Sequence, residues 1–219
     1  NKDFNEFRLL NYITLKNLLL ALSNESKIPN KIIFASTISV YGERMDRKFH
    51  YEDDQTNPVS PYAITKLKAE KFLLNNYFSQ AYVLRLAPVY FKNFLLNINR
   101  RTKISGYNYK VGSGTKKLSL CNMKNILASI CGILNDELPN GIYNVSDDKE
   151  YCYNDLLNFV GDKTYIVVPE LLIKPFYYFG KATDNIYLQE NLIKLLSDNI
   201  YPSKKINSYL KIKYNLNDV

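Results

Sequence analysis

The sequence predicts an α/β fold in which two parallel strands are joined by a crossover helix. Two short apolar runs, residues 32–35 and 82–87, lack polar alternation, as expected for strands buried on both faces of a parallel sheet. A polar loop and a helix over about residues 60–78 separate them. Strand, helix and strand in this order form a βαβ unit, and the carboxyl ends of its strands line a ligand crevice.

The helices are predicted from their periodicity and their caps. Apolar residues recur every three or four positions between residues 4 and 22, which is typical of an amphipathic helix. Ser60 suits the N-cap of the crossover helix, and Pro61 suits its first position. After Pro88 we expect, in order, a helix near residues 91–99, a hairpin around Gly112-Ser113-Gly114, a helix near 122–134, and strands at 142–145 and 165–168.

The composition excludes several classes of protein. Lys and Arg number 29 against 21 Asp and Glu, which gives a net charge of +8, but no helix collects a basic stripe, so nucleic acid is not an expected partner. One His and three dispersed Cys offer no metal-ligand spacing, so no metal site is expected. The odd Cys count fits a reducing compartment, which predicts a cytoplasmic location. The most apolar stretch, residues 165–180, is too interrupted to predict a membrane span.

One pair of residues, Tyr62 and Lys66, has the spacing and the place of an acid/base centre. On a helix, Y-x-x-x-K puts the phenol and the ammonium one turn apart, where the cation is expected to lower the pKa of the phenol. The spacing alone decides nothing, because it also occurs at Tyr12/Lys16, Tyr177/Lys181, Tyr201/Lys205 and Tyr209/Lys213. Only Tyr62/Lys66 lies at the crevice end of the βαβ unit, where Thr37 ends the first strand.

These segments resemble the extended short-chain dehydrogenase/reductase family. Residues 36–42 (STISVYG) and 58–66 (PVSPYAITK) look like those of its nucleotide-sugar epimerases, dehydratases and reductases, and further likeness lies in Asn11 and in residues 84–90 and 141–146. The resemblance implies the C-terminal part of a Rossmann-like parallel sheet with crossover helices, plus a small mixed substrate-binding domain. Residues 1–90 would be half of the dinucleotide-binding domain. Residues 91–219 would mainly bind substrate, with segments near 122–145 returning to the sheet.

The same resemblance implies roles for single residues. Tyr62 would be the acid/base on a sugar hydroxyl, Lys66 would hold the nicotinamide ribose, and Thr37 and Ser39 would contact the substrate. Ser36 and Pro88 would lie on the cofactor side. The cofactor would be NAD or NADP, the substrate a UDP-, GDP- or dTDP-sugar, and the protein a homodimer formed through the helices at residues 4–22 and 61–78.

Departures from the family pattern narrow this expectation. The 4,6-dehydratases carry Asp-Glu directly after the Thr, whereas Ile38 and Ser39 stand here, so dehydration is disfavoured and an epimerase or 4-ketoreductase is expected. A dinucleotide fold also needs a glycine-rich turn after its first strand, and Gly112-Ser113-Gly114 fits a hairpin turn better. We therefore expect a fragment whose cofactor-binding half lies upstream and which is inactive alone. The alternative is a non-catalytic remnant or an NAD(P)-sensing relative.

Overall fold

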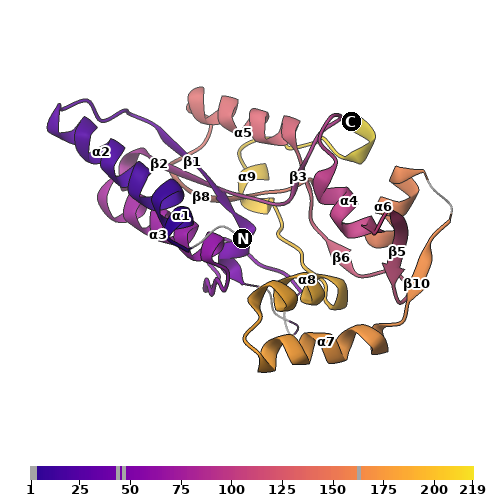
Figure 1. The fold of residues 1–219 in the computed structure, drawn as a ribbon. Helices are drawn as coiled ribbons and strands as arrows, with labels where there is room; N and C mark the ends of the chain where they lie inside the picture. The colour runs from indigo at the N-terminus through magenta and orange to yellow at the C-terminus, as the bar shows by residue number, and fades with distance from the viewer. Residues whose placement is uncertain (1–3, 43–44, 46–47, 162–163) are drawn as a thin grey trace.

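The centre of the molecule is a parallel sheet of three strands. The computed structural model describes residues 4–42, 45, 48–161 and 164–219 (Figure 1). The sheet has the order β1 (Ile32–Thr37), β2 (Ala81–Leu86) and β8 (Gly141–Val145), with β2 in the middle. All three strands were predicted from their apolar runs and are confirmed within two residues.

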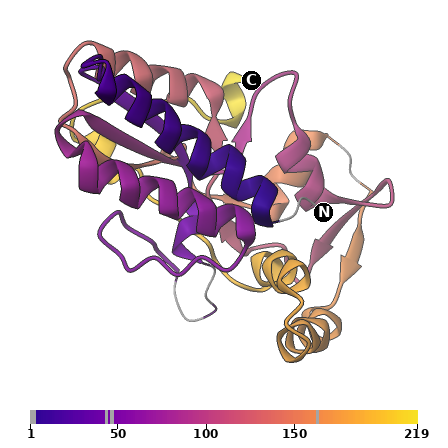
Figure 2. The same cartoon turned by 60° about the vertical axis from the view of Figure 1, so that its left-hand side comes forward.

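Two long helices cover one face of this sheet. The first consists of α1 (Phe4–Arg8), a π-helical turn (Leu9–Ile13) and α2 (Thr14–Asn24), and the crossover helix is α3 (Pro61–Asn76). Figure 2 shows the first helix, in indigo, lying beside α3. Leu19, Phe34, Leu73 and Val83 join in one apolar cluster between these helices and the sheet.

The opposite face is covered by α5 (Met123–Leu134) and the short α9 (Lys204–Asn207). There Leu84 and Tyr143 of the sheet pack with Ile133 and Ile206. Successive residues of β2 thus face opposite clusters, which explains why its sequence is apolar without alternation. This part of the molecule therefore has three layers, with the sheet between two layers of helices.

A second, smaller region follows Pro88 and has its own apolar core, which includes Tyr90, Ile98, Leu120 and Leu156. Its strands form a mixed three-stranded sheet and two short pairs, and its helices pack around them. These elements are β3 (Val89–Tyr90) with β7 (Cys121–Asn122), β6 (Lys117–Leu118) with β9 (Tyr151–Cys152), β10 (Ile166–Val168) with β5 (Tyr107–Val111) and β4 (Lys103–Ile104), and helices α4 (Leu96–Thr102) and α6 (Tyr153–Val160).

Two predictions in this region were wrong. The glycines at 112 and 114 do form a turn with positive φ, but β5 and β6 on its two sides pair with different strands, so no hairpin forms there. The predicted helix at 91–99 begins only at Leu96. Its first residues instead form a tight turn, in which the backbone groups of Phe91 and Phe94 bond to each other and their rings stack at 5.5 Å.

The outermost helices are α7 (Glu170–Ala182) and α8 (Ile186–Leu196), which pack on each other at the periphery (Figure 1). In the described part of the chain, no helix has both the length and the apolar character needed to span a bilayer.

Candidate functional site

The carboxyl end of β1 presents two hydroxyl groups held close together. Thr37 ends the strand, and its Oγ1 accepts a hydrogen bond from the Ser39 amide at 3.2 Å and lies 3.3 Å from the Ser39 hydroxyl. Thr37 thereby caps the 3₁₀ turn Ile38–Tyr41. Gly42 ends this turn at φ +71°, and a Cβ there would lie 2.1 Å from the carbonyl oxygen of Asn57, so only glycine fits.

Tyr62 lies in the first turn of α3, the helix that packs against β1 and the 3₁₀ turn after it. The Ser60 side chain accepts from the Ala63 amide at 3.5 Å, which confirms the predicted helix start. The ring of Phe7 meets the Tyr62 ring edge to face at 5.8 Å, and 36% of Tyr62 stays exposed. Burial of the remainder raises the pKa of the phenol above its usual value, because phenolate is poorly solvated there.

Lys66 lies one turn further along the same face of α3. Its ammonium donates to the carbonyl oxygen of Ala35 at 2.9 Å and lies 4.9 Å from the Phe34 ring centre and 5.9 Å from that of Tyr62. Burial lowers the pKa of Lys66, and the charge of Glu70 counteracts this. The expectation that Lys66 lowers the pKa of Tyr62 was wrong, since the ammonium is bound to β1 and burial of the phenol decides the direction.

A buried ion pair that the sequence analysis missed lies behind these residues. Arg85 of β2 bonds to Glu70 of α3 through Nη2 at 2.8 Å and through Nε at 3.2 and 3.3 Å. The two side chains are only 4% and 1% exposed, and the hydroxyl of Ser36 also donates to Glu70. The sequence did carry a signal for this ion pair. Arg85 stands alone in an otherwise apolar strand, and a charge buried there nearly always has a partner of opposite charge.

The ion pair continues into a network that fixes the loop segment around Glu52. Arg85 Nη1 donates to the carbonyl of Glu52 at 3.2 Å, and the guanidinium lies 4.7 Å from the ring centre of Tyr41. The backbone N–H of Asn144 in β8 donates to the Glu52 carboxylate at 2.9 Å, and the Asn144 side-chain oxygen accepts from the Tyr41 hydroxyl at 2.7 Å. β1, β2, β8, α3 and the loop therefore meet in one polar cluster.

The remaining predicted residues are placed differently. The Ser36 hydroxyl faces Glu70 in the interior, and the Pro88 carbonyl accepts from the Cys121 amide at 3.1 Å, where β3 meets β7. Asn11, in the π-helical turn, donates to the Thr65 hydroxyl at 3.1 Å and so ties the first helix to α3. The structure brings Thr37 and Ser39 together, and likewise Tyr62 and Lys66.

These residues fit one end of a nicotinamide dinucleotide. A phenol, an ammonium and two hydroxyls are suited to the ribose and to a substrate oxygen. For the pyrophosphate the described residues offer no fit, because none of their parallel strands leads into a glycine-rich turn. Among the same residues, no cluster of His, Cys, Asp and Glu could hold a metal ion.

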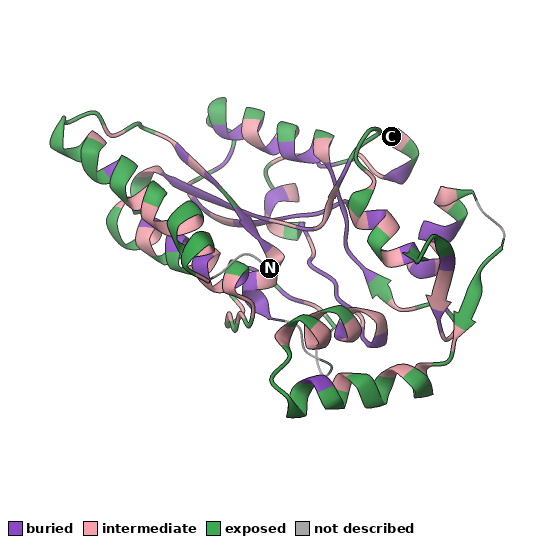
Figure 3. Cartoon of the chain, viewed as in Figure 1, coloured by how far each residue is buried: buried purple, intermediate pink, exposed green. Residues whose placement is uncertain are grey.

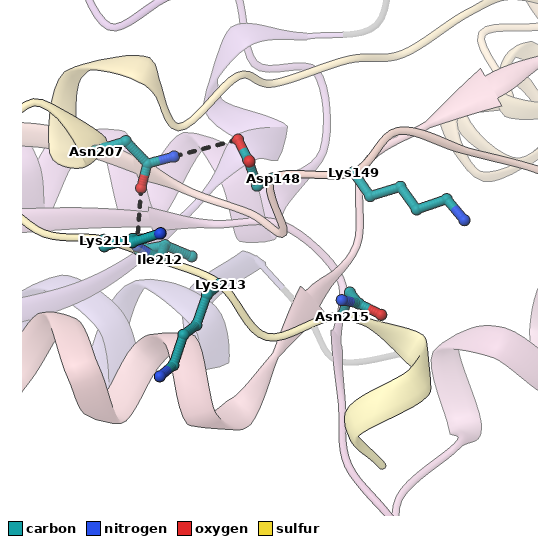
Figure 4. A pocket seen from close by; sticks show the side chains of 7 residues that line it. All are labelled: Asp148, Lys149, Asn207, Lys211, Ile212, Lys213 and Asn215. Atoms are coloured by element: carbon teal, nitrogen blue, oxygen red, sulfur yellow. Dashed lines mark hydrogen bonds between the residues drawn. The ribbon is translucent and has the colours of Figure 1, made fainter.

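A pocket of about 430 Å³ lies elsewhere, between the loop after β8 and residues 207–215. Asn207 donates to Asp148 at 3.4 Å and accepts from the Ile212 amide at 3.0 Å, which holds its wall together. Figure 4 shows the side chains of Lys149 and Lys213 extending in different directions. The pocket is basic, but its charges do not converge on one ligand position.

Comparison with known proteins identifies the family. A family model described as GDP-mannose 4,6 dehydratase matches residues 5–125, more than half of the chain. The chain belongs to this family, within the extended short-chain dehydrogenases/reductases. A search among curated proteins found no match.

Solved structures of this extended family share the fold at low identity. UDP-glucuronic acid 4-epimerase from Bacillus cereus, solved with NAD, is 19% identical with a TM-score of 0.72, and the match covers 100% of this chain and 67% of that one. dTDP-glucose 4,6-dehydratase from Bacillus anthracis, also solved with NAD, is 16% identical with a TM-score of 0.67, and the match covers 100% of this chain and 67% of that one. ADP-L-glycero-D-manno-heptose-6-epimerase from Helicobacter pylori is 16% identical with a TM-score of 0.66, and the match covers 95% of this chain and 62% of that one.

These matches agree with the predicted fold class. The parallel sheet with its helices is the Rossmann-like α/β fold of epimerases and dehydratases. The chain spans about two thirds of the length of these solved relatives.

Proposed function

We propose that this chain carries the substrate side of a nucleotide-sugar epimerase or 4-ketoreductase that works by NAD(P)-dependent hydride transfer through a 4-keto-sugar. The observation that supports this best is the placement of Tyr62 and Lys66 on one face of α3, which packs against β1 and the turn that holds Thr37 and Ser39. The proposal requires a glycine-rich βα turn from residues outside these 219. The relatives solved with NAD support the choice of cofactor class.

Each residue has a definite task in this proposal. A bound nicotinamide dinucleotide would supply the hydride chemistry, taking up and returning a hydride in an epimerase and giving one to the keto carbon in a 4-ketoreductase. Tyr62 moves the proton at the sugar 4-oxygen, and Thr37, whose hydroxyl donates to Ser39 Oγ at 3.3 Å in this structure, would turn that proton to the same oxygen. Lys66 binds the ribose. Because burial raises the pKa of Tyr62, the phenol keeps its proton at neutral pH and is ready to protonate a keto oxygen.

The absence of an acid/base pair after Thr37 supports epimerisation or reduction over dehydration. Elimination of water from a sugar needs an acid on the leaving hydroxyl and a base on the neighbouring carbon. Ile38 and Ser39, which follow Thr37, can supply neither. The sugar and its nucleotide are to be found by assay.

The domain division and the homodimer are parts of the same proposal. In the proposal, residues 1–90, with segments near 122–145, belong to the cofactor side, and most of 91–219 belongs to the substrate side. The first helix exposes Leu9, Leu10, Leu18 and Leu20 by 43–56%, which supports a dimer through this helix and α3. Sedimentation of the protein and of Leu10→Ser tests it, since the variant should shift the protein towards monomer.

A second candidate is a relative that keeps the fold without turnover. It is supported by the Lys66 ammonium, which is bound to the carbonyl of Ala35 and would have to leave it to reach a ribose. The deciding assay incubates the protein with NAD(H) and UDP-, GDP- and dTDP-sugars and follows inversion or reduction at C4 by NMR. Product formation supports the enzyme, and binding without any product supports the second candidate.

A separate titration tests the need for an upstream half. The 219 residues are titrated with NAD(H) and with UDP-sugars by calorimetry. We expect weak or no binding of the dinucleotide, because the pyrophosphate has no glycine-rich turn here. Tight binding by these residues alone would contradict that requirement.

A further inference from the structure

The outward face of α7 is apolar over nearly half of the helix circumference. At about 100° per residue, Ile173, Tyr177 and Gly180 share one side, which faces α8. Gly180 is buried there, and a Cβ at this position would lie 3.2 Å from the Leu188 side chain. The opposite side carries Pro175, Ala182 and five large apolar residues with 58–78% exposure, namely Leu171, Leu172, Phe176, Tyr178 and Phe179.

This arrangement inverts the usual amphipathic pattern, in which the apolar side of a helix faces the core. Figure 3 shows α7 green along most of its length. Tyr187 of the neighbouring α8 adds another ring with 75% exposure. Large exposed apolar side chains gathered on one face of a helix mark an interaction surface.

Charged residues border the patch on one side only. Lys174 and Lys181 are seven residues apart and therefore lie in one row along α7, with Glu170 at the amino-terminal end of the same border. Within the described residues neither lysine forms an ion pair. The whole chain has a net charge of +8. An apolar, aromatic helix face bordered by lysines is typical of helices that lie in a lipid interface.

The size and shape of the patch argue against a second copy as its occupant. Five side chains of about 200 Å² each, roughly three fifths exposed, offer about 600 Å². This area is at the lower end of the roughly 600–1,000 Å² that each partner buries in a stable protein interface. A partner helix packs along a narrow seam and would cover only part of a face this broad, whereas a lipid surface can take up its whole width.

We propose that the outward face of α7 docks the protein on an anionic lipid surface. The apolar and aromatic side chains enter the headgroup region, and Lys174 and Lys181 stay at its aqueous border, as long basic side chains do. The net positive charge attracts the protein to anionic lipid before these side chains insert. This proposal is independent of the nucleotide-sugar activity.

The sequence contains no Trp, so an introduced Trp is a specific probe. Phe179→Trp reports on the patch, and Phe78→Trp is a matched control, because the two Phe are 62% and 59% exposed on different parts of the molecule. Both proteins are mixed with vesicles of phosphatidylcholine containing 30% phosphatidylglycerol, and with vesicles of phosphatidylcholine alone. We expect a blue shift, and quenching by brominated lipid, only for Phe179→Trp with anionic vesicles.

Cosedimentation then measures affinity. Phe176→Ser/Phe179→Ser should reduce binding to anionic vesicles at least tenfold, while the control Leu127→Ser/Leu134→Ser on α5, with 55% and 58% exposed side chains, should not. If the first variant fails to fold by circular dichroism, Leu171→Ser/Tyr178→Ser replaces it.

Three results would overturn the proposal. They are no binding of the unsubstituted protein to either vesicle, unchanged binding of the α7 variants, and a dimer that only the α7 variants dissociate. The last result would identify a second copy as the occupant.

Discussion

The molecule buries carboxylates in two different ways. Glu70 is neutralised by the guanidinium of Arg85 beneath the candidate site. Asp147, just after β8, instead accepts from neutral donors among the residues that the structure describes. These are the Tyr90 hydroxyl at 2.5 Å, the Asn122 amide at 2.7 Å, the Tyr151 hydroxyl at 2.8 Å and Asn125 Nδ2 at 2.9 Å.

The difference separates a positioning cluster from a structural one. The Glu70–Arg85 pair touches Ser36, next to Thr37, and Glu70 lies one turn from Lys66, so this pair fixes both halves of the candidate site. Asp147 joins β3, β7 and the C-terminal segment, where Tyr151 also accepts from the Leu216 amide at 3.2 Å. Damage to the first cluster should affect chemistry and stability, and damage to the second should affect stability alone.

The largest stability effect is expected for Arg85→Leu. It leaves the carboxylate of Glu70 buried without a cation, which costs about 3–5 kcal/mol. Urea unfolding measures this cost. The double variant Glu70→Met/Arg85→Leu removes both charges of the pair and should lose less stability than Arg85→Leu alone. If the free energy of unfolding of Arg85→Leu were within about 1 kcal/mol of that of the unsubstituted protein, the ion pair would not be what stabilises this cluster.

A smaller effect is expected for Asp147→Asn. An amide accepts fewer of the four donors, which costs about 1–3 kcal/mol because buried donors lose their partner. Turnover per folded molecule should stay unchanged, since Asp147 makes no contact with Thr37, Tyr62 or Lys66 among the described hydrogen bonds. Equal loss of turnover in Asp147→Asn and Arg85→Leu would remove the distinction between the two clusters.

The cost of Asp147→Asn should depend on pH. Burial raises the pKa of Asp147 above 3.8, so the folded state holds this proton to a higher pH than the unfolded state does. The contribution of the Asp147 carboxyl to the free energy of unfolding is therefore largest below pH 3.8, and it decreases as the pH rises through the folded-state pKa. Unfolding at pH 4 and pH 7 should show the larger cost at pH 4. A larger cost at pH 7 would reverse the assigned direction.

The smallest effect is a spectroscopic one at Tyr62. With the Arg85 charge taken by Glu70 and Lys66 bound to Ala35, burial keeps the phenol protonated beyond pH 10.0. The absorbance titration of the protein minus that of Tyr62→Phe should show this group titrating above pH 10. A group titrating below pH 9 would mean that Lys66 acts on the phenol as the sequence suggested.

The sequence predicted elements that depend on local chemistry. Ser60 and Pro61 placed the start of α3, and the apolar runs placed β1 and β2, because caps and burial leave marks at those residues themselves. The turn at Gly112 and Gly114 was also found, but the partners of its flanking strands were not, since strand pairing is set by distant residues. For the same reason Tyr62 and Lys66 were paired correctly by spacing, whereas the carbonyl of Ala35 that binds Lys66 could not be foreseen.

The central claim is that Tyr62 is the proton-transfer residue of a nucleotide-sugar enzyme, and turnover of Tyr62→Phe in the protein with a complete cofactor site tests it most directly. Tyr12→Phe is the matched control, because Tyr12 and Lys16 have the same spacing but lie in the first helix. Loss of the phenol should reduce turnover about 10²–10⁴-fold with dinucleotide binding retained, since this is the usual contribution of a general acid or base. Turnover of Tyr62→Phe equal to that of Tyr12→Phe would contradict the claim.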